Sequence, residues 1–526
     1  MCCSMFRVLL MSCVMLTCVN SYNILALFPY PGKSHYAVYD PFIVELANRG
    51  HNVTIYDTFP KSQTIPNYHE IDISYCLEFS SEPEIQLMKN IGKTGFNLVD
   101  LLAIVFPKYD EIAKCKPLMD LWNTSQKYDV LITEIFHNEV SLLFGEKLNI
   151  PIIATHSTAP MPWHSELMGL PANPSYLAVE FNGYTSKMNF FQRLSNTLMN
   201  YYTRISYEYR SRDVYDEMTR EIFGNSVSRM RDVVKKVSLL LLNIHFSYGI
   251  PRPMVPNVVE IAGLHIKQSQ PLPENIEKFI NESKHGVVYF CMGSLLRGET
   301  FPPEKREAFL YAFSKIPQRV LWKWEGDVLP GKSDNIMISK WMPQRDILAH
   351  PNVKLFISHG GLLGTSEAVY EGVPVLGIPI FGDQRTNIKS LEANGAGELL
   401  DYNEISKEVV LEKIQRLLND PKYKENAKLL SDRYRDRPMS PLDTAVYWTE
   451  YVIRHKGAPH LRTAAADMPW YQYLLLDVIA FIVAVLVAGL LIIYYTTKFI
   501  LRAIYGLICG GGAKKGSSKS DKKKRN

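Results

Sequence analysis

The residues best suited to chemistry lie in one run of this chain, 341–384. There an apolar segment, 353–358, ends at His359-Gly360-Gly361, and a helix is predicted to open near Thr365. Glycine lets a backbone approach a ligand closely, and a helix N-terminus offers free N–H groups and a positive dipole to a phosphate. His359 adds a donor at the same place. Taken alone, this pattern is a weak signal for an anion site.

The loop before that segment strengthens the signal. It reads Trp341-Met-Pro-Gln344, which supplies an indole face and a side-chain amide. A tryptophan is often a core residue, but the loop sequence Trp-x-Pro-Gln argues for the wall of a ligand site. The indole could stack on a nucleobase while the amide reads the edge of the base. Together the loop and the glycine turn favour nucleotide binding.

These residues need a scaffold, and the second half of the chain predicts one. Short apolar strands alternate there with helical spans, which is typical of a parallel, doubly wound α/β sheet. Ligands of such sheets bind at the carboxyl ends of the strands. The predicted strands are 287–290, 319–324, 335–339, 353–358, 373–378 and 398–400.

The first half repeats the pattern less regularly. Strand 23–28, a Pro/Gly loop, a helix over 36–48 and a strand from Val53 predict a βαβ unit, and 129–133 and 152–155 continue it. Residues 180–250 are rich in Tyr, Phe and Met, as an insertion lining an apolar pocket would be. The Pro-rich stretch 251–273 is the predicted linker. Helical material near 441–455 is expected to pack back on the first half.

Both ends of the chain carry targeting signals. Residues 1–21 hold one basic residue, an apolar run and short residues before Tyr22, which predicts a cleaved signal peptide. Residues 474–497 predict a transmembrane helix, because 478–497 is uncharged and apolar. Because basic residues beside a span stay on the cytosolic side, the tail 498–526 is expected in the cytosol and the bulk of the chain in the lumen. This is the topology of a single-pass type I protein. Lys523 and Lys524 near the end are similar to the dilysine retrieval signal of endoplasmic-reticulum membrane proteins.

Charge and composition narrow the function classes. The chain has 526 residues, 47% hydrophobic and 21% charged, which suits two domains with extensions and excludes a mainly disordered chain. Its net charge is +5. The tail 498–526 contributes nine Lys/Arg and one Asp, or +8, so the remainder sums to 5 − 8 = −3. The basic balance therefore reflects membrane topology, and no nucleic-acid partner is expected.

Cysteine and asparagine positions agree with a lumenal protein. Cys76, Cys115 and Cys291 remain between the signal peptide and the span, which allows at most one disulfide and leaves one thiol. No pair has zinc-ligand spacing, and no metal site is expected. The predicted glycan acceptors are Asn52, Asn123 and Asn281, of which Asn52 lies against a predicted buried strand.

The run WMPQRDILAHPNVKLFISHGGLLGTSEAVYEGVPVLGIPIFGDQ, 341–384, resembles the signature of the UDP-glycosyltransferase family nearly residue for residue. The segment 435–452 is similar to the closing segment of its insect members. The resemblance covers essentially the whole chain. It implies the GT-B type fold, two Rossmann-like domains facing a cleft. The acceptor domain would be 22–250, and the UDP-sugar domain would be 274–470 with closing helices packing on the first.

The resemblance also implies roles in donor binding. Trp341 would stack on the uracil, Gln344 would contact the edge of the uracil or the ribose, and Glu367 would hold the ribose hydroxyls. Ser294, His359 and Gly361 would bind the diphosphate. Asp383 and Gln384 would hydrogen-bond the hydroxyls of the sugar. Ser294 and Asp383 could also be simple helix caps. Leu363 stands where the family usually has an Asn that contacts phosphate.

In the first half the resemblance places the catalytic base at His35. A neutral imidazole can take the proton of a hydroxyl near physiological pH, and a carboxylate should orient it. The family has an Asp for this purpose, whereas this sequence offers Glu134 and Glu139. Both remain candidates, and either could be a solvated residue at a helix start.

The implied reaction is a single displacement with inversion. It would move a hexose, glucose by preference, from a UDP-sugar to a hydroxyl of a small lipophilic acceptor, with no bound cofactor and no metal. A homo- or hetero-oligomer is compatible with the sequence. The alternative is a catalytically weak relative that acts as a binding or partner subunit, which Leu363 and the missing Asp motivate.

Overall fold

A computed structural model describes residues 21–61, 63–77, 111–136, 138–293 and 298–509. The body, up to Ala466, and the segment from Asp467 onward form two separate units. Ser294 and the body of the predicted signal peptide lie outside the described residues, as does most of the predicted cytosolic tail. The boundaries predicted for the individual domains stay predictions.

The first half of the body is built on a seven-stranded sheet whose strands are all parallel. Its order is β3-β2-β1-β4-β5-β6-β7. The strands are β1 (Asn23–Phe28), β2 (Asn52–Asp57), β3 (Tyr68–Asp72), β4 (Val130–Glu134), β5 (Ile152–His156), β6 (Val237–Leu242) and β7 (Val258–Glu260). The predicted linker, 251–273, thus contains the edge strand β7.

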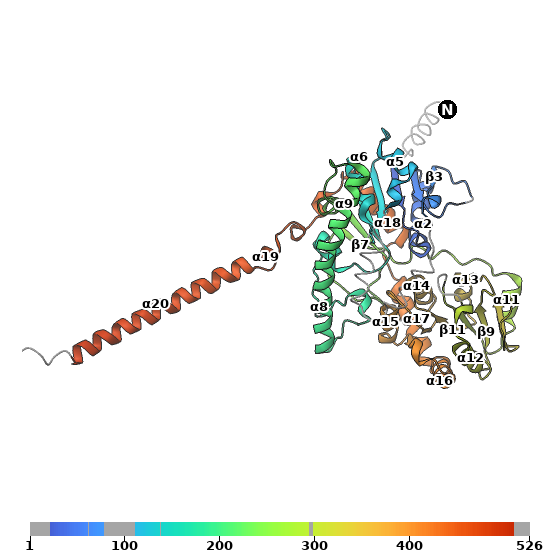
Figure 1. Ribbon diagram of the computed structural model, residues 1–526. Coiled ribbons are helices and arrows are strands. Elements are labelled where there is room, and N and C mark those ends of the chain that lie inside the picture. The colour runs from blue at the N-terminus through green and yellow to red at the C-terminus, as the bar shows by residue number, and fades with distance from the viewer. Residues whose placement is uncertain (1–20, 62, 78–110, 137, 294–297, 510–526) are drawn as a thin grey trace, which may run out of the picture. The chain divides into compact units, whose positions relative to one another are not determined.

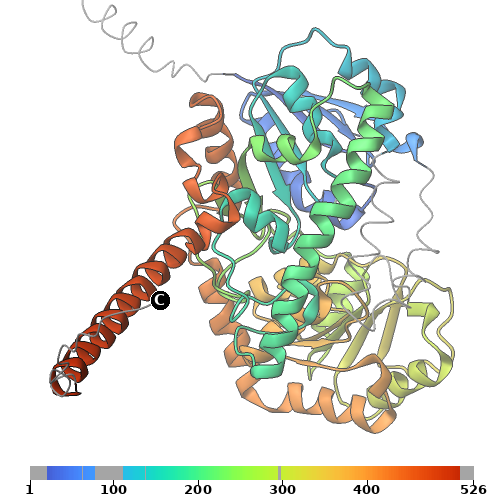
Figure 2. The same ribbon diagram turned by 60° about the vertical axis from the view of Figure 1, so that its left-hand side comes forward.

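The second half is built on a six-stranded parallel sheet, in the order β10-β9-β8-β11-β12-β13. Figure 2 shows the two halves, one with the blue to green ribbon and the other mostly yellow to orange. The strands are β8 (Val287–Cys291), β9 (Arg319–Lys323), β10 (Ile336–Ser339), β11 (Val353–Ser358), β12 (Val375–Gly377) and β13 (Gly397–Leu399). The doubly wound architecture expected from the sequence is confirmed.

Apolar residues line both faces of each sheet, as a sheet covered by helices on both sides requires. Along β1, Leu25 and Leu27 pack in one buried cluster, whereas Ile24 and Ala26 pack in another. Successive side chains of a strand point to opposite faces, so one continuous apolar run supplies both cores. This explains why unbroken apolar runs rather than alternating patterns predict these strands.

Helices cover the sheets (Figure 1). Those of the first half are α2 (Lys33–Asn48), α5 (Lys116–Trp122), α6 (Leu142–Leu148), α7 (Pro162–Met168), α8 (Phe190–Ser206), α9 (Arg212–Phe223) and α10 (Met230–Val233). Those of the second half are α11 (Glu274–Asn281), α12 (Pro303–Phe313), α13 (Gln344–Ala349), α14 (Leu362–Glu371), α15 (Gln384–Ala393), α16 (Lys407–Asn419) and α17 (Pro421–Arg435).

The helix α18 (Pro441–Arg454) returns to the first half, as the sequence led us to expect. Its Ala445, Val446 and Val452 are buried in the same cluster as the inner face of α2. Polar contacts support this packing, because His51 Nε2 lies 3.2 Å from Glu450 Oε1 and the Arg49 guanidinium contacts Asp443. The chain therefore links the two halves twice within the body.

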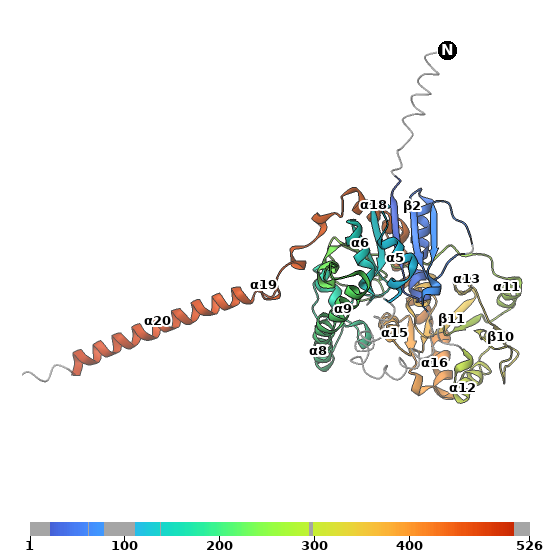
Figure 3. The ribbon, with the colours of Figure 1, turned by 45° about the horizontal axis from the view of Figure 1, so that its top comes forward.

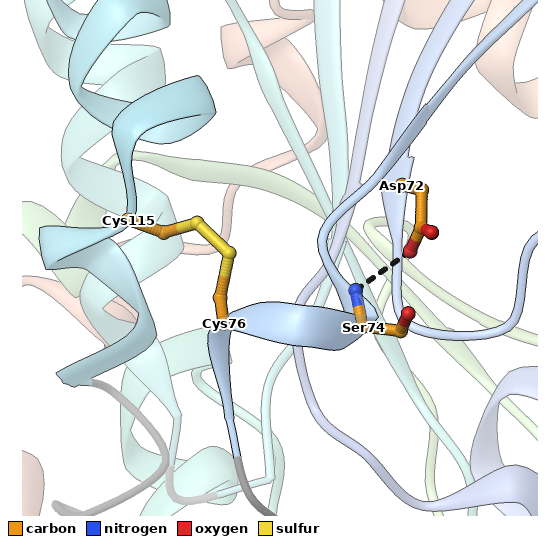
Figure 4. Close-up of a disulfide and its surroundings, with 4 residues drawn as sticks. All are labelled: Asp72, Ser74, Cys76 and Cys115. Carbon is orange, nitrogen blue, oxygen red and sulfur yellow. Dashed lines mark hydrogen bonds between the residues drawn. A yellow bond between two sulfur atoms is a disulfide. The ribbon is translucent and has the colours of Figure 1, made fainter.

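A disulfide joins Cys76, in a short turn after β3, to Cys115 before α5 (Figure 4). The two cysteines are 39 residues apart in the sequence. Cys291, at the end of β8, is a buried free thiol. One disulfide and one remaining thiol were expected, and the structure identifies which cysteine is which.

The described helices of the unit after Ala466 are α19 (Trp470–Tyr473) and α20 (Leu476–Cys509), seen at the end of the chain in Figure 3. The helix α20 has 34 residues, a mean hydropathy of 3.0 in its most apolar window and no buried residue. By length and composition it can cross a membrane. It continues past the predicted end at 497, because charged Lys498 and Arg502 interrupt an apolar run without ending a helix.

Candidate active site

The imidazole of His35 lies at the carboxyl end of the first sheet, where β1 gives way to α2. His35 is the third residue of α2, whose N-cap is Gly32. Glu134 is the last residue of the neighbouring strand β4. His35 Nδ1 is 2.8 Å from Glu134 Oε1, and the Glu134 side chain is almost fully buried. Neighbouring parallel strands bring these residues, 99 positions apart, to one edge.

A further contact to His35 was not anticipated from the sequence. Ser157, just after β5, places its Oγ 2.9 Å from His35 Nδ1. The rings of Tyr30 and Phe136 meet the imidazole edge-on, with centroids 4.9 and 4.7 Å away. No described residue hydrogen-bonds Nε2, so that nitrogen is free to accept a proton. The only feature of the sequence that could have identified Ser157 as a site residue is its position just after a predicted strand.

The rival carboxylate, Glu139, has a different partner. It lies in the short turn η3 (Glu139–Ser141), where it accepts a hydrogen bond of 2.6 Å from the Tyr207 hydroxyl. Burial raises the pKa of Glu139, and the Tyr207 hydrogen bond opposes that shift. The structure therefore brings Glu134 to His35 and directs Glu139 to a separate buried pair.

In the second half, the predicted base-binding loop leaves its indole in solvent. Trp341 is 67% exposed, although it is a large aromatic side chain. Beside it, Gln344 opens α13 and donates from Nε2 to Glu367 Oε2 at 2.7 Å. Burial raises the pKa of Glu367 to about 7, against the opposing effect of that hydrogen bond. An exposed indole and a half-buried carboxylate form a surface that can receive a planar base and a diol.

At the predicted phosphate turn the helix begins at Leu362, earlier than the expected start near Thr365. The strand β11 ends at Ser358, and Gly361 is the N-cap of α14. A Cβ on Gly361 would stand 2.5 Å from His359 Nε2, and one on Gly293 would stand 2.5 Å from His359 Cε1. Both glycines are needed because the imidazole packs directly against the two turns. Burial lowers the pKa of His359 to about 4, and the ammonium of Lys323 lowers it further.

Asp383 and Gln384 lie at the start of α15, which begins at Gln384. Gln384 is buried and accepts at Oε1 from the backbone N–H groups of Ile380 and Phe381, at 2.8 and 3.1 Å. Asp383 is the N-cap residue, but its Oδ2 accepts from Asn387 at 2.8 Å and makes no capping bond.

Asp383 is also close to the base of the first half. Burial raises the pKa of Asp383, whereas Asn387 and the His35 imidazole lower it. The Asp383 carboxylate and His35 therefore interact electrostatically, although they belong to different halves of the body. A second buried acid, Glu180, interacts with Asp383, and burial raises the pKa of Glu180 to about 7. Sequence reasoning missed Glu180, which lies in the irregular region of the first half.

Leu363 packs where a polar phosphate contact was expected. Its side chain is half-buried against the apolar cluster of the first half, and its carbonyl oxygen lies 3.2 Å from His265 Nε2. Leu363 thus contributes to contact between the halves. Any phosphate at this turn would meet the backbone N–H groups and His359 instead.

The predicted glycan acceptors differ in access. Asn123 and Asn281 are exposed at helix ends, and their amides donate to Met119 and Glu277 of the preceding turns. Asn52 opens β2, its amide donates to Asn23 at 2.8 Å, and Thr54 of its acceptor motif is buried. Among the described residues, no group of three or more His, Cys, Asp or Glu is placed to hold a metal ion.

Comparison with known proteins gives one consistent result. The family model described as UDP-glucoronosyl and UDP-glucosyl transferase matches residues 32–510. The UDP-glycosyltransferase UGT5 of Dactylopius coccus is 61% identical, over 94% of this chain and 95% of its own length. UDP-glucosyltransferase 2 of the same insect is 42% identical, over 99% and 100%. Human UDP-glucuronosyltransferase 2B7 is 33% identical, over 88% and 90%.

Solved structures agree on the architecture. CalG4, the calicheamicin glycosyltransferase, matches with a TM-score of 0.55 at 16% identity, over 83% of this chain and 99% of its own. VinC, solved in complex with dTDP, matches with a TM-score of 0.54 at 15% identity, over 82% and 100%. At such identity the likeness shows the fold alone, which is GT-B.

Proposed function

This chain belongs to the UDP-glucuronosyl and UDP-glucosyl transferase family and is a UDP-glycosyltransferase, and on that premise we propose its substrates and mechanism. It transfers glucose from UDP-glucose to a hydroxyl of a small lipophilic acceptor and inverts the anomeric carbon. His35 is the base, and Glu134 holds it. The observation that carries this proposal is the 2.8 Å contact between His35 Nδ1 and Glu134 Oε1, with Nε2 left free.

The contact sets the direction of proton transfer. With its proton on Nδ1, donated to Glu134, the neutral imidazole presents the lone pair of Nε2 to an acceptor hydroxyl. As Nε2 takes the hydroxyl proton, the acceptor oxygen forms a bond to the anomeric carbon. The bond from that carbon to the diphosphate oxygen breaks, and UDP leaves with the electron pair. The imidazolium that results is stabilised by the buried Glu134 carboxylate.

Donor binding is assigned to the second half. Trp341 stacks on the uracil, Gln344 contacts its edge or the ribose, and Glu367 accepts from the ribose hydroxyls. Neutral His359 donates an N–H to the diphosphate, beside Gly361 and the N-terminus of α14. Ser294 completes the diphosphate site in this proposal. Asp383 and the free amide of Gln384 bind the hydroxyls of the sugar.

Two observations support the choice of substrates. The relative that is 42% identical is named a UDP-glucosyltransferase, which supports glucose as the transferred sugar. For the acceptor, the aromatic rings of Tyr30 and Phe136 lie beside the His35 imidazole, which gives the proposed base an apolar surrounding.

The proposed setting is the endoplasmic-reticulum membrane. The helix α20 is a candidate span, and the body carries one disulfide, which is typical of an oxidising compartment. With α20 as a single type I span, the body is lumenal and the basic tail is cytosolic.

The deciding experiment compares Glu134→Gln with Glu139→Gln in the full chain. Glu134→Gln removes the charge that orients His35, so kcat should fall on the order of 10²-fold or more. Glu139→Gln is the matched control, because Glu139 is also a buried carboxylate after β4, but its partner is the Tyr207 hydroxyl and not His35. Its kcat should stay within about threefold of the wild-type value.

Steady-state kinetics with UDP-glucose and UDP-glucuronate show which glutamate supports His35 and which sugar is transferred. NMR of the product gives its anomeric configuration. Equal losses in the two variants would contradict the assignment of Glu134. A faster reaction with UDP-glucuronate would contradict glucose as the sugar, and retention of configuration would contradict the single displacement.

A further inference from the structure

The helix α8 (Phe190–Ser206) exposes an apolar face and buries a mostly polar one, the reverse of an ordinary surface helix. Its buried residues are mostly polar, whereas its outward residues are large and apolar. The buried set is Asn196, Met199, Asn200, Thr203 and Ser206. The exposed set, here called the α8 stripe, is Phe190, Phe191, Leu194, Leu198, Tyr201 and Ile205. Surface helices of proteins in water normally place these two kinds of residue the other way round.

Hydrogen bonds of the buried polar side chains hold α8 in this orientation. The Asn196 amide nitrogen donates to the carbonyls of Pro174 and Leu177, both at 2.8 Å, and its oxygen accepts from Val179 N–H at 2.8 Å. The Thr203 hydroxyl donates to Asn200 O at 2.9 Å. These satisfied buried groups fix the rotation of α8 about its axis. The stripe is therefore exposed because the polar face is locked inward.

The stripe is continuous along the whole helix. At 3.6 residues per turn, its members recur every three or four positions and fall on one side. Phe191 is 76% exposed and Leu198 is 56% exposed. Figures 1 and 3 both show α8 at the outer edge of the body. A row of exposed apolar side chains on this scale marks an interaction surface.

The charged residues of α8 itself and of the loop before it are basic. Residues 181–207 contain no Asp or Glu, but they include Lys187, Arg193 and Arg204. Eleven positions, about three turns, separate Arg193 from Arg204, so both lie on the same flank of the stripe. Arg204 also pairs with Glu166 at 3.0 Å. Phe, Leu and Tyr on one face with basic residues beside them, at low overall hydrophobicity, are typical of a helix lying in a membrane interface.

We propose that α8 docks on a lipid bilayer, with the α8 stripe in the boundary between headgroups and acyl chains. The chain supplies its own bilayer, because α20 is long and apolar enough to span one. A tethered surface is present at high effective concentration, so even a weak interfacial helix would be bound to it. Tyr209, in the π-helical turn that follows α8, is also exposed, at 70%.

The test uses the full chain in lipid nanodiscs, with the photoreactive residue benzoylphenylalanine replacing Phe191. Illumination should attach phospholipid to position 191, detected by mass spectrometry, at a yield at least fivefold above that at a control position. The control is Tyr311, an exposed aromatic on α12 beside Lys315 and Lys407. An aromatic replacement at an exposed position preserves the fold, which sugar-transfer activity checks.

A second variant sharpens the result. Leu198→Glu, placed in the background with the photoreactive residue, should lower the lipid adduct at position 191 at least fivefold, because a charge in the stripe opposes insertion. Leu429→Glu on α17 is the matched control, since Leu429 is 47% exposed, similar to Leu198, and should leave the adduct unchanged.

Other outcomes overturn the proposal. A crosslink at position 191 to a second copy of the chain would show that the stripe is a self-association face. A crosslink to a different protein would show a protein-docking face. No adduct above the Tyr311 level, or an equal loss with Leu198→Glu and Leu429→Glu, would show that the stripe does not enter lipid.

Discussion

In the first half of the molecule the central polar residue is held from several sides, whereas in the second half the central aromatic residue stands in water. Glu134 and Ser157 contact the same nitrogen of His35, and two rings flank its imidazole. Trp341, by contrast, is 67% exposed. A base must be aligned before the reaction, whereas a stacking surface must be accessible to a ligand. The two halves therefore differ in the way their proposed tasks require.

The largest effect should come from the residue that is held most firmly. His35→Ala removes the proposed base, and kcat should fall roughly 10³-fold, within the range for general base catalysis. The UDP affinity should stay within about twofold, because the proposed nucleotide contacts lie in the other half. Steady-state kinetics and calorimetric titration with UDP measure the two quantities.

That variant also separates the two classes of function. Sugar transfer at the wild-type rate in His35→Ala would show that another group takes the proton. A wild-type protein that binds UDP but transfers no sugar would favour a role as a binding or partner subunit.

A smaller effect is expected from the exposed residue. Trp341→Ala should weaken UDP binding about 10- to 100-fold, since stacking of a base on an aromatic ring contributes about 1–3 kcal/mol. The kcat at saturating donor should change much less. Trp341→Phe is the control and should retain most of the affinity. Unchanged UDP affinity in Trp341→Ala would show that the base binds elsewhere.

The smallest effect concerns protonation in the second half. Burial raises the pKa of Glu367 to about 7 from its ordinary value of 4.5, so this carboxyl is largely protonated at pH 6 and ionised at pH 8. Ribose hydroxyls donate better to the ionised form. Uridine affinity should therefore rise with pH, roughly tenfold from pH 6 to pH 8.

Uridine is the appropriate probe because it carries no phosphate that titrates in this range. Glu367→Gln should remove the pH dependence and leave a weak, constant affinity. A pH dependence that persists in Glu367→Gln would assign it to another group.

Several local features could be predicted because their cause is local. The apolar runs of the strands, the glycine turn at 359–361 and the residues of the run 341–384 all depend on neighbours in the sequence. The short edge strand β7 was not predicted, because its three residues lie in a Pro-rich stretch and pair only through β6. The choice between Glu134 and Glu139 was also beyond the sequence, since both come after the same predicted strand, 129–133.

The sequence of α8 likewise does not determine which face of the helix is exposed. Its period indicates a helix with one apolar face, and such a face is normally assigned to the core. The structure turns it outward because Asn196 finds three backbone partners in the segment 174–179. No periodicity within α8 contains that information.

The sequence by itself determined the family, the doubly wound halves, the apolar span and the types of residue available for chemistry, because each is written in contiguous patterns of hydrophobicity and motif. Tertiary structure alone decided which carboxylate meets His35, that Ser157 joins it, that Asp383 comes within electrostatic range of it, and which face of α8 is exposed. These depend on contacts between residues far apart in the chain, and such contacts exist only once the strand ends and the two halves have been brought together.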